Sequence, residues 1–501
     1  MERLSPEELA QLDPAGRALA SPVPTRPISN GEFMPAAQNE AQARVEARIL
    51  ALADEIGGRL NLPRRRFLAS SAGMAAAFLA MNEVYGRLFD ADAAEAATPE
   101  LAEARAGTLA GQLVIDVHTH FVRPDAGPGL QYFADLREKT RRKGYNPELP
   151  ARVQTLNDLH VDTYVREMWL DSDTKVATLS GAPSDVEHDW LLSNDAIAEA
   201  RARINADAGS KRLYSHFIFT PGQPGWLEAI DRGIETLKPD AWKGYTIGDN
   251  THKELSRYPW RMDDEAVTYK AYEKFANAGV RHVAVHKGLF TQSDQKNFPR
   301  LMEYARVDDV GKAAHDWPQL NFLIYHAGYR YTGDGEPALA DAEFERTGKM
   351  EWISDLAEVP GKYGVTNVYA DVGASFAACC IAQPRAAAAM MGLLVKGLGA
   401  DHVLWGTDSI WFGSPQWQIE ALRRLEIPED MQRRFGFAPL GPADGPVKRA
   451  ILGENAARVL GMAAGARTAW QGDRLAARKL AYQAQGGERT NRAYGWVRRT
   501  G

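Results

Sequence analysis

Short apolar runs rich in β-branched residues alternate with longer segments of helical periodicity from residue 113 onward. Eight runs have the length and composition of buried strands: Leu113–His120, Lys175–Ser180, Leu213–Thr220, Ala241–Ile247, His282–His286, Asn321–His326, Asn367–Val372 and His402–Thr407. Helix-like segments lie between them, among them Asn194–Ala208, Pro224–Leu237, Asp264–Ala278 and Glu351–Glu358. This alternation predicts an α/β fold, and eight strands favour a closed (β/α)8 TIM barrel over an open sheet.

Polar side chains of the kind that carry out chemistry stand in several of these runs, mostly where a strand ends. They are His120, Lys243, His286, His326 and, just past the last run, Asp408. Active sites of such barrels lie at the carboxyl ends of the strands. Because a buried polar side chain costs free energy unless it is paired, packing alone does not explain polar residues at equivalent places around one barrel.

The first predicted strand carries two histidines on one face. Side chains alternate along a strand, so His118 and His120 point the same way, about 7 Å apart. Over that span two imidazoles can reach one metal ion at bonds of about 2.0 to 2.1 Å. The pair alone is equally compatible with two core histidines, and the polar residues of the later strands shift the balance towards metal ligands.

Composition and charge narrow the class of protein. The chain has 501 residues, of which 45% are hydrophobic and 25% charged, as in soluble globular proteins. Its net charge is −6 and its basic residues are scattered, so we expect neither nucleic acid nor an anionic membrane surface as a partner. The two cysteines, Cys379 and Cys380, are adjacent in sequence, which disfavours a disulfide and predicts two core residues.

The N-terminal region resembles a bacterial twin-arginine export signal. Arg-Arg-Arg-Phe-Leu at 64–68 precedes an apolar run that ends at Met81, and small-x-small cleavage candidates follow at 91–96. The resemblance implies a partly disordered leader over residues 1–97, a periplasmic protein and export machinery as a partner. The apolar run is shorter than the roughly 20 residues that span a bilayer, so we expect no stable membrane span. The alternative is an ordinary helix with basic flanks in a cytoplasmic protein, which the long segment before the arginines favours.

Five motifs together resemble the amidohydrolase superfamily. They are Asp-Val-His-Thr-His at 116–120, Val-Ala-Val-His-Lys-Gly around His286, Leu-Ile-Tyr-His-Ala-Gly around His326, Leu-Trp-Gly-Thr-Asp-Ser around Asp408, and Ile-Leu-Gly-Glu-Asn-Ala-Ala-Arg-Val-Leu-Gly at 451–461. The branch they resemble most is the amidohydrolase-related group that includes aminocarboxymuconate-semialdehyde decarboxylase. The resemblance covers about residues 111–462. We therefore expect the barrel over 98–462, followed by a C-terminal helix and tail over 463–501 as a candidate contact in a homo-oligomer.

The resemblance also implies roles for the polar residues. A divalent metal would be bound by His118, His120, His286 and Asp408, and Asp408 would also handle a proton. His326 is a catalytic acid or electrostatic group in one-metal members and a second ligand in two-metal members. Nitrogen and oxygen ligands without thiolate suit zinc best, with manganese as an alternative.

Lys243 has two interpretations. It occupies the place where some two-metal hydrolases carry a carbamylated bridging lysine, but an ordinary surface-reaching or substrate-binding lysine explains it better. Arg330, four residues beyond His326, is a candidate group for binding a substrate carboxylate.

Three functions follow as hypotheses, each involving a small molecule. The first is hydrolysis of a small amide, lactone or ester by metal-activated water, with Asp408 and His326 as the catalytic residues. The second is metal-dependent, non-oxidative decarboxylation of an aromatic or enol carboxylate, for which nearly the same residues serve. The third is a non-catalytic exported binding protein, which a proton-handling Asp408 disfavours.

Overall fold

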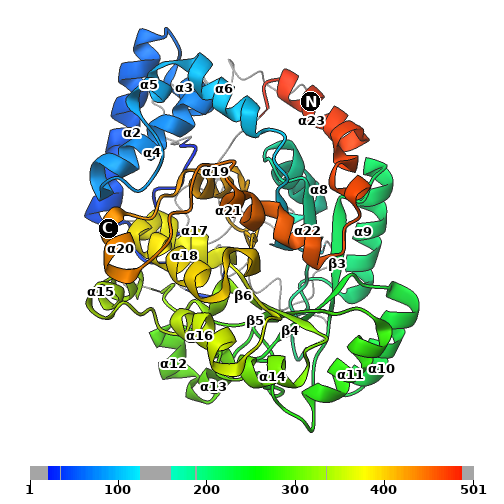
Figure 1. Cartoon of the computed structure of the whole chain (residues 1–501). Helices are drawn as coiled ribbons and strands as arrows, with labels where there is room; N and C mark the ends of the chain where they lie inside the picture. The colour runs from blue at the N-terminus through cyan, green and yellow to red at the C-terminus, as the bar shows by residue number, and fades with distance from the viewer. Residues whose placement is uncertain (1–20, 34, 124–158, 187–188, 334–335, 488–501) are drawn as a thin grey trace.

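The computed structural model describes residues 21–33, 35–123, 159–186, 189–333 and 336–487. Within them, eight parallel strands form one sheet in the order β1 to β8, which confirms the predicted barrel (Figure 1). The strands are β1 (Ile115–Thr119), β2 (Val176–Leu179), β3 (Leu213–Ile218), β4 (Ala241–Tyr245), β5 (His282–His286), β6 (Asn321–Tyr325), β7 (Val368–Asp371) and β8 (Val403–Leu404).

Backbone hydrogen bonds join the two ends of the sheet. Val117 N donates to Trp405 O at 3.0 Å, and Asp408 N donates to His118 O at 2.8 Å. These bonds place the residues after β8 beside β1. The last strand and the first therefore meet, as a closed barrel requires.

Helices surround the strands and cover them from water. They are α8 (Val161–Val165), α9 (Asn194–Ala208), α10 (Trp226–Arg232), α11 (Thr268–Ala278), α12 (Gln292–Asn297), α13 (Met302–Ala305), α14 (Val310–Asp316), α15 (Glu336–Thr347), α16 (Ile353–Tyr363), α17 (Gly373–Ala382), α18 (Pro384–Leu398), α19 (Gln416–Arg424), α20 (Glu429–Phe435), α21 (Pro446–Arg449) and α22 (Asn455–Val459). Helix α9 has the predicted bounds because Ser193 caps its first turn and Gly209, at φ 78°, ends it.

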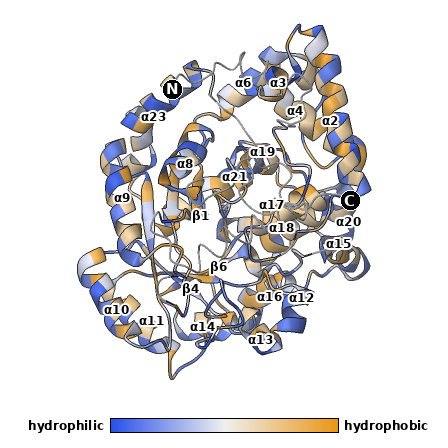
Figure 2. Cartoon of the chain, turned by 180° about the vertical axis from the view of Figure 1, so that it is seen from behind, coloured by the Kyte–Doolittle hydropathy of each residue, from blue (hydrophilic) through white to orange (hydrophobic). Residues whose placement is uncertain are grey.

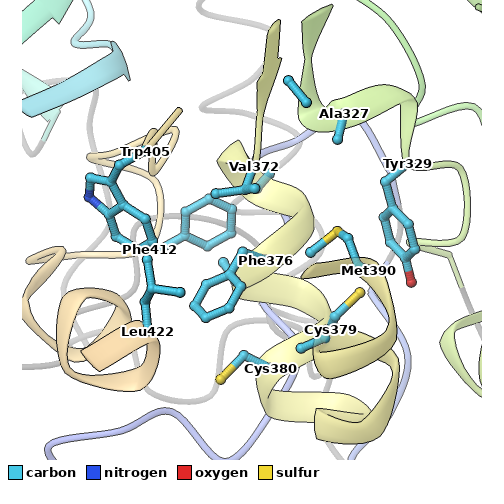
Figure 3. Packing of buried hydrophobic residues seen from close by; sticks show 14 of the residues in the cluster. Ala327, Tyr329, Val372, Phe376, Cys379, Cys380, Met390, Trp405, Phe412 and Leu422 are labelled. Carbon is cyan, nitrogen blue, oxygen red and sulfur yellow. The ribbon is translucent and has the colours of Figure 1, made fainter. Parts of the chain in front are cut away.

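Helix α17 lies entirely within the core. Every one of its residues is buried. Figure 3 shows Phe376, Cys379 and Cys380 of this helix packed among Met390 of α18 and Trp405, which follows β8. Both cysteines are buried and unbridged, and burial raises the pKa of each thiol above its ordinary value. Their role is to fill the core.

Helices also precede the barrel and form a layer of their own, drawn in blue and cyan in Figure 1. They are α2 (Glu40–Arg59), α3 (Arg64–Leu68), α4 (Ser71–Tyr85), α5 (Ala93–Ala97) and α6 (Pro99–Leu109). The apolar run of the expected export signal forms α3 and α4. Phe67 and Phe78 are fully buried there, in the same hydrophobic cluster as the barrel residues Phe376 and Leu422.

This layer is tied to the barrel through α19. Phe89 pairs with Leu425 in an antiparallel bridge, and the Arg424 guanidinium contacts both Glu95 carboxylate oxygens at 2.5 and 2.9 Å. Residues 21–97, as far as they are described, are therefore part of the fold, where the sequence analysis set them apart as a partly disordered leader. Burial explains their apolarity, and export itself stays a prediction.

Beyond α22 the chain returns along the outside of the barrel and forms α23 (Arg474–Ala484). Figure 2 shows this helix as mostly hydrophilic. Just before it, Asp473 accepts hydrogen bonds from the Arg212 guanidinium, with Nε at 2.6 Å. Across the described ranges no helix combines the length and the apolarity that crossing a membrane needs. Residues 1–20 of the expected leader and 488–501 of the expected tail lie outside the described residues.

Candidate metal centre

The ends of four strands bring the predicted site residues to one mouth of the barrel. His118 lies in β1 with His120 just beyond it, His286 ends β5, His326 follows β6 and Asp408 follows β8. Each of these residues is buried, with at most 3% of its surface exposed. The His326 ring lies 4.8 Å from the His118 ring and 4.6 Å from the His286 ring, measured between centroids. The residues expected from the sequence are therefore neighbours in space.

Three of them form a first cluster, made of His118, His120 and Asp408. One ligand atom from each lies within 4.8 Å of the others. Asp408 Oδ1 is 3.5 Å from His118 Nε2 and 3.3 Å from His120 Nε2. The three atoms thus face a common point, as the ligands of one cation must.

Hydrogen bonds on the far side of each imidazole set which nitrogen is free. His120 Nδ1 lies 2.9 Å from the Ser180 carbonyl oxygen, which only accepts, so Nδ1 carries the proton and Nε2 keeps its lone pair. His118 Nδ1 lies 2.9 Å from Asp371 Oδ2, and this contact turns Nε2 towards the first cluster. Metal-binding histidines commonly have such a carbonyl or carboxylate partner.

Asp371, which ends β7, is a site residue that the sequence analysis did not single out. It is fully buried and also accepts a hydrogen bond from Gly373 N at 3.2 Å. Burial raises the pKa of its carboxyl to about 8, although Lys243 acts in the opposite direction. Burial also lowers the pKa of His118 well below its ordinary value, which keeps this imidazole neutral and able to bind metal. The position of Asp371 at a strand end was the only signal in the sequence.

A second cluster adjoins the first and consists of Glu32, His286 and His326. Glu32 Oε2 lies 3.2 Å from His286 Nε2, and His286 Nδ1 lies 3.2 Å from His326 Nε2. One ligand atom from each residue again lies within 4.8 Å of the others. The structure therefore divides the four expected ligands between two clusters, with His286 in the second. Glu32 was missed because it lies in the segment assigned to the leader.

Lys243 lies inside the barrel. Its side chain is fully buried, Nζ has no hydrogen-bond partner among the described residues, and it sits 3.6 Å from the centroid of the Tyr325 ring. Burial lowers the pKa of this amine to about 7. A surface-reaching lysine is thereby excluded.

Arg330, the expected carboxylate-binding group, is already engaged. Its guanidinium donates to Glu351 Oε2 at 2.7 Å and stacks over the Trp352 ring, 5.2 Å from the centroid. The side chain is 7% exposed. Arg330 therefore stabilises the loop after β6, and the hypothesis that it binds substrate loses its basis.

Two site residues have strained backbone conformations. His326 has φ 62° and Asp408 has φ 58°, in the left-handed region that side chains with Cβ rarely adopt. The surroundings hold both: Ser375 Oγ donates to His326 O at 2.7 Å, and Asp408 N donates to His118 O at 2.8 Å. Such strain is concentrated at functional sites because it directs a side chain where regular structure would not.

Imidazole nitrogens and carboxylate oxygens without a thiolate make up both clusters, a donor set that suits a divalent cation. The fold and the site thus define a (β/α)8 barrel with two residue clusters that could hold a divalent cation at the carboxyl ends of its strands. Residues 115–462 match the amidohydrolase family, and the chain belongs to this family. Family and site together identify a metal-dependent hydrolase or carboxy-lyase.

Solved structures resemble about 70% of the chain. An uncharacterised TIM-barrel protein from Bordetella bronchiseptica is 16% identical, with a TM-score of 0.44, over 70% of this chain and 98% of that one. 5-Carboxyvanillate decarboxylase from Sphingomonas paucimobilis is 15% identical, with a TM-score of 0.39, over 70% and 100%. 2,6-Dihydroxybenzoate decarboxylase from Rhizobium is 13% identical, with a TM-score of 0.40, over 70% and 99%. No curated protein matches the sequence.

Proposed function

We propose that the protein removes carbon dioxide from a small aromatic or enol carboxylic acid at the metal centre. The observation that carries this choice is the exclusion of water, because His118, His326 and Asp408 are each at most 2% exposed. Hydrolysis consumes a water molecule at the reacting carbon, whereas loss of carbon dioxide consumes none. Removal from water destabilises the localised charge of a substrate carboxylate. The charge is more dispersed in the transition state, so this loss of solvation favours the release of carbon dioxide.

The surroundings of Asp408 support the same choice. Its Oδ1 faces the Nε2 atoms of His118 and His120, and its Oδ2 accepts a hydrogen bond from Asn30 Nδ2 at 2.7 Å. The hydrogen bond from Asn30 holds the carboxylate so that Oδ1 faces the first cluster, where it can bind a cation and take part in protonating the substrate carbon. The resemblance of the sequence motifs to the branch that includes aminocarboxymuconate-semialdehyde decarboxylase agrees with this reaction.

In the proposed reaction the bond between the carboxylate and its carbon breaks, and the electron pair stays on that carbon, which then takes one proton. Burial lowers the pKa of His326 well below its ordinary value, so a neutral imidazole with one N–H faces the site. His326 and Asp408 are the groups placed to hold and move the proton. His118, His120 and Asp408 would hold a divalent cation, which supplies polarisation of a substrate oxygen. We propose zinc, with manganese as the alternative.

Hydrolysis of a small amide, lactone or ester is the second candidate. The position of Asp408 Oδ1 between two imidazole nitrogens favours it, because a carboxylate there is close to any water molecule that enters the first cluster. The two reactions differ in what they consume, and they can therefore be separated by isotopes.

The protein is exported to the periplasm and associates with copies of itself in the same proposal. The arginine pair at residues 64 and 65 and the small residues at 91–96 support export to the periplasm by the twin-arginine machinery. The hydrophilic helix α23 carries an exposed Leu480, 69% accessible, which supports a contact between copies of the chain.

Isotope incorporation tests the reaction. The metal-loaded protein is incubated with a panel of hydroxybenzoates, enol carboxylates, lactones and amides, once in D2O and once in H2 18O. Decarboxylation releases carbon dioxide and leaves deuterium on the carbon that carried the carboxylate, and Asp408→Asn abolishes it. Incorporation of 18O into a product carboxylate without carbon dioxide would establish hydrolysis and overturn the proposal.

A further inference from the structure

A turn far upstream of the barrel in sequence reaches the metal clusters. It spans residues 29–33 and is closed by hydrogen bonds from Ser29 Oγ to Phe33 O at 2.5 Å and from Gly31 N to Ser29 Oγ at 3.0 Å. Gly31 has φ 102°, which a side chain with Cβ would disfavour. Lys253 Nζ donates to Glu32 O at 3.2 Å and ties the turn to the loop after β4. The turn therefore holds a defined position at the mouth of the barrel.

The side chain of Asn30 links the two clusters. Its Nδ2 donates to Asp408 Oδ2 at 2.7 Å and to Glu32 Oε1 at 2.8 Å. The second oxygen of each carboxylate then faces imidazoles: Asp408 Oδ1 lies 3.3 Å from His120 Nε2, and Glu32 Oε2 lies 3.2 Å from His286 Nε2. One amide thus orients one carboxylate in each cluster, as the outer hydrogen bonds of metal ligands do.

Two polar atoms of the second cluster are buried without a hydrogen-bond partner among the residues that the structure describes. The first is Glu32 Oε2, which lies 3.2 Å from His286 Nε2 and accepts no hydrogen bond from the described residues. His326 Nδ1 is buried and has no hydrogen-bond partner in the described part of the chain. Buried polar atoms without a partner cost free energy, and binding a cation removes that cost.

The two clusters are neighbours at the mouth of the barrel. Each cluster offers ligand atoms that lie within 4.8 Å of one another, and the rings of His118 and His326, one from each cluster, are 4.8 Å apart. Paired metal sites place their ions about 3.5 to 4 Å apart. One carboxylate and two imidazoles form a common ligand set for a divalent cation.

We propose that Glu32, carried by the segment before the barrel, is a ligand of a second divalent cation, which it holds together with His286 and His326. The inference rests on the proposed function, in which His118, His120 and Asp408 hold the first cation. Asn30 acts as a positioning residue for the carboxylate ligands of both ions.

Metal counting with Mn²⁺ tests this proposal on the full-length chain. The protein is stripped with chelator, dialysed against Mn²⁺ and freed of unbound metal, and its manganese is measured per polypeptide. We expect two equivalents in the wild type and one in Glu32→Gln, whose side chain has nearly the same shape. Electron paramagnetic resonance should change from the spectrum of two coupled Mn²⁺ ions to that of an isolated ion. The matched control, Glu40→Gln at the exposed start of α2, should keep both equivalents.

Each outcome has one meaning. Two equivalents in both the wild type and Glu32→Gln would show that Glu32 is not a ligand, and one equivalent in the wild type would show that the second site does not exist. Either result overturns this inference and leaves the proposed function standing, whereas no bound metal in the wild type would overturn the proposed function. If Glu32→Gln does not fold, Asn30→Ala replaces it, with an expected loss of about 10- to 100-fold in Mn²⁺ affinity. Unchanged affinity in that variant would contradict the positioning of both carboxylates.

Discussion

The hydrogen bond between His118 and Asp371 depends on the absence of a side chain at residue 406. A Cβ built on Gly406 would lie 1.9 Å from Asp371 Oδ1 and 2.8 Å from His118 Cβ. Contacts this short cannot be relieved by rotating a flexible side chain, because both neighbours are themselves packed and fully buried. The orientation of the His118 ring therefore rests on a glycine that binds nothing.

Gly406→Ala is expected to weaken metal binding by about 10- to 100-fold, because Asp371 must move away from His118 Nδ1. Overpacking should also lower the free energy of unfolding by about 1 to 3 kcal/mol. Titration with Mn²⁺ and urea denaturation measure the two effects.

Gly107→Ala is the matched control, because Gly107 lies within α6 and a Cβ there meets no atom within 4 Å. This change should raise the free energy of unfolding by about 0.5 to 1 kcal/mol and leave Mn²⁺ binding unchanged. Wild-type metal affinity in Gly406→Ala would show that the Asp371 contact does not orient His118.

Individual residues differed in how far the sequence revealed them. His118, His120, His286, His326 and Asp408 stand at strand ends, and the period of the strands is enough to bring them together. Asp371 also ends a predicted strand, but a lone aspartate there has no motif. Asn30 and Glu32 carried no signal, because no periodicity tells where a turn outside the barrel docks.

At the scale of elements, helix α19 connects the N-terminal layer to the barrel. Arg424 is 2% exposed and pairs with Glu95 of α5 and, within its own helix, with Glu420 at 3.3 Å. The neighbouring Arg423 is 1% exposed and pairs with Asp173 at 2.6 Å. Removing one partner from such a buried network leaves the others as unpaired charges.

Arg424→Met is therefore expected to lower the free energy of unfolding by about 3 to 5 kcal/mol, since it leaves Glu95 without its ion-pair partner and Glu420 with Arg423 alone. Urea denaturation followed by tryptophan fluorescence measures the change. The control is Arg433→Met in α20, whose salt bridge to Glu429 is exposed, with 72% and 84% of the side chains accessible. Its loss should cost no more than about 1 kcal/mol, and equal effects of the two changes would contradict the importance of the buried network.

The elements themselves were largely predictable, and the exceptions have a physical cause. Helix α9 has the predicted bounds because both of its ends carry capping residues. Strand β8 was expected over His402–Thr407 and spans Val403–Leu404, because the residues after it turn into the mouth of the barrel and hydrogen-bond to β1. Hydrophobic pattern cannot distinguish a longer strand from a chain that leaves the sheet to place Asp408.

At the scale of the whole molecule, the expected export signal and the folded N-terminal layer occupy the same residues. Arg64 is 39% accessible at its side chain and pairs with Asp54 at 2.6 Å, and Arg65 is exposed. The apolar residues that follow are buried in α3 and α4. The two arginines are therefore accessible to a receptor, whereas the apolar residues that follow them are buried in the fold.

Fractionation of cells tests the export proposal. The wild type is expected in the periplasm, and the double variant Arg64→Lys, Arg65→Lys is expected to stay in the cytoplasm, because the twin-arginine pathway reads the arginine pair. Immunoblots of the two fractions measure the distribution. Recovery of both proteins from the cytoplasm alone would end the hypothesis, and Arg59→Lys, at an exposed arginine outside the pair, controls for the exchange of arginine for lysine in the same region.

The turn at residues 29–33 lies upstream of the cleavage candidates at 91–96. A protease that cut there would remove Glu32 together with the export signal. The precursor and the cleaved protein would then differ in the number of metal ions that they bind. The metal content per polypeptide of the purified protein would therefore tell whether the chain has been cleaved.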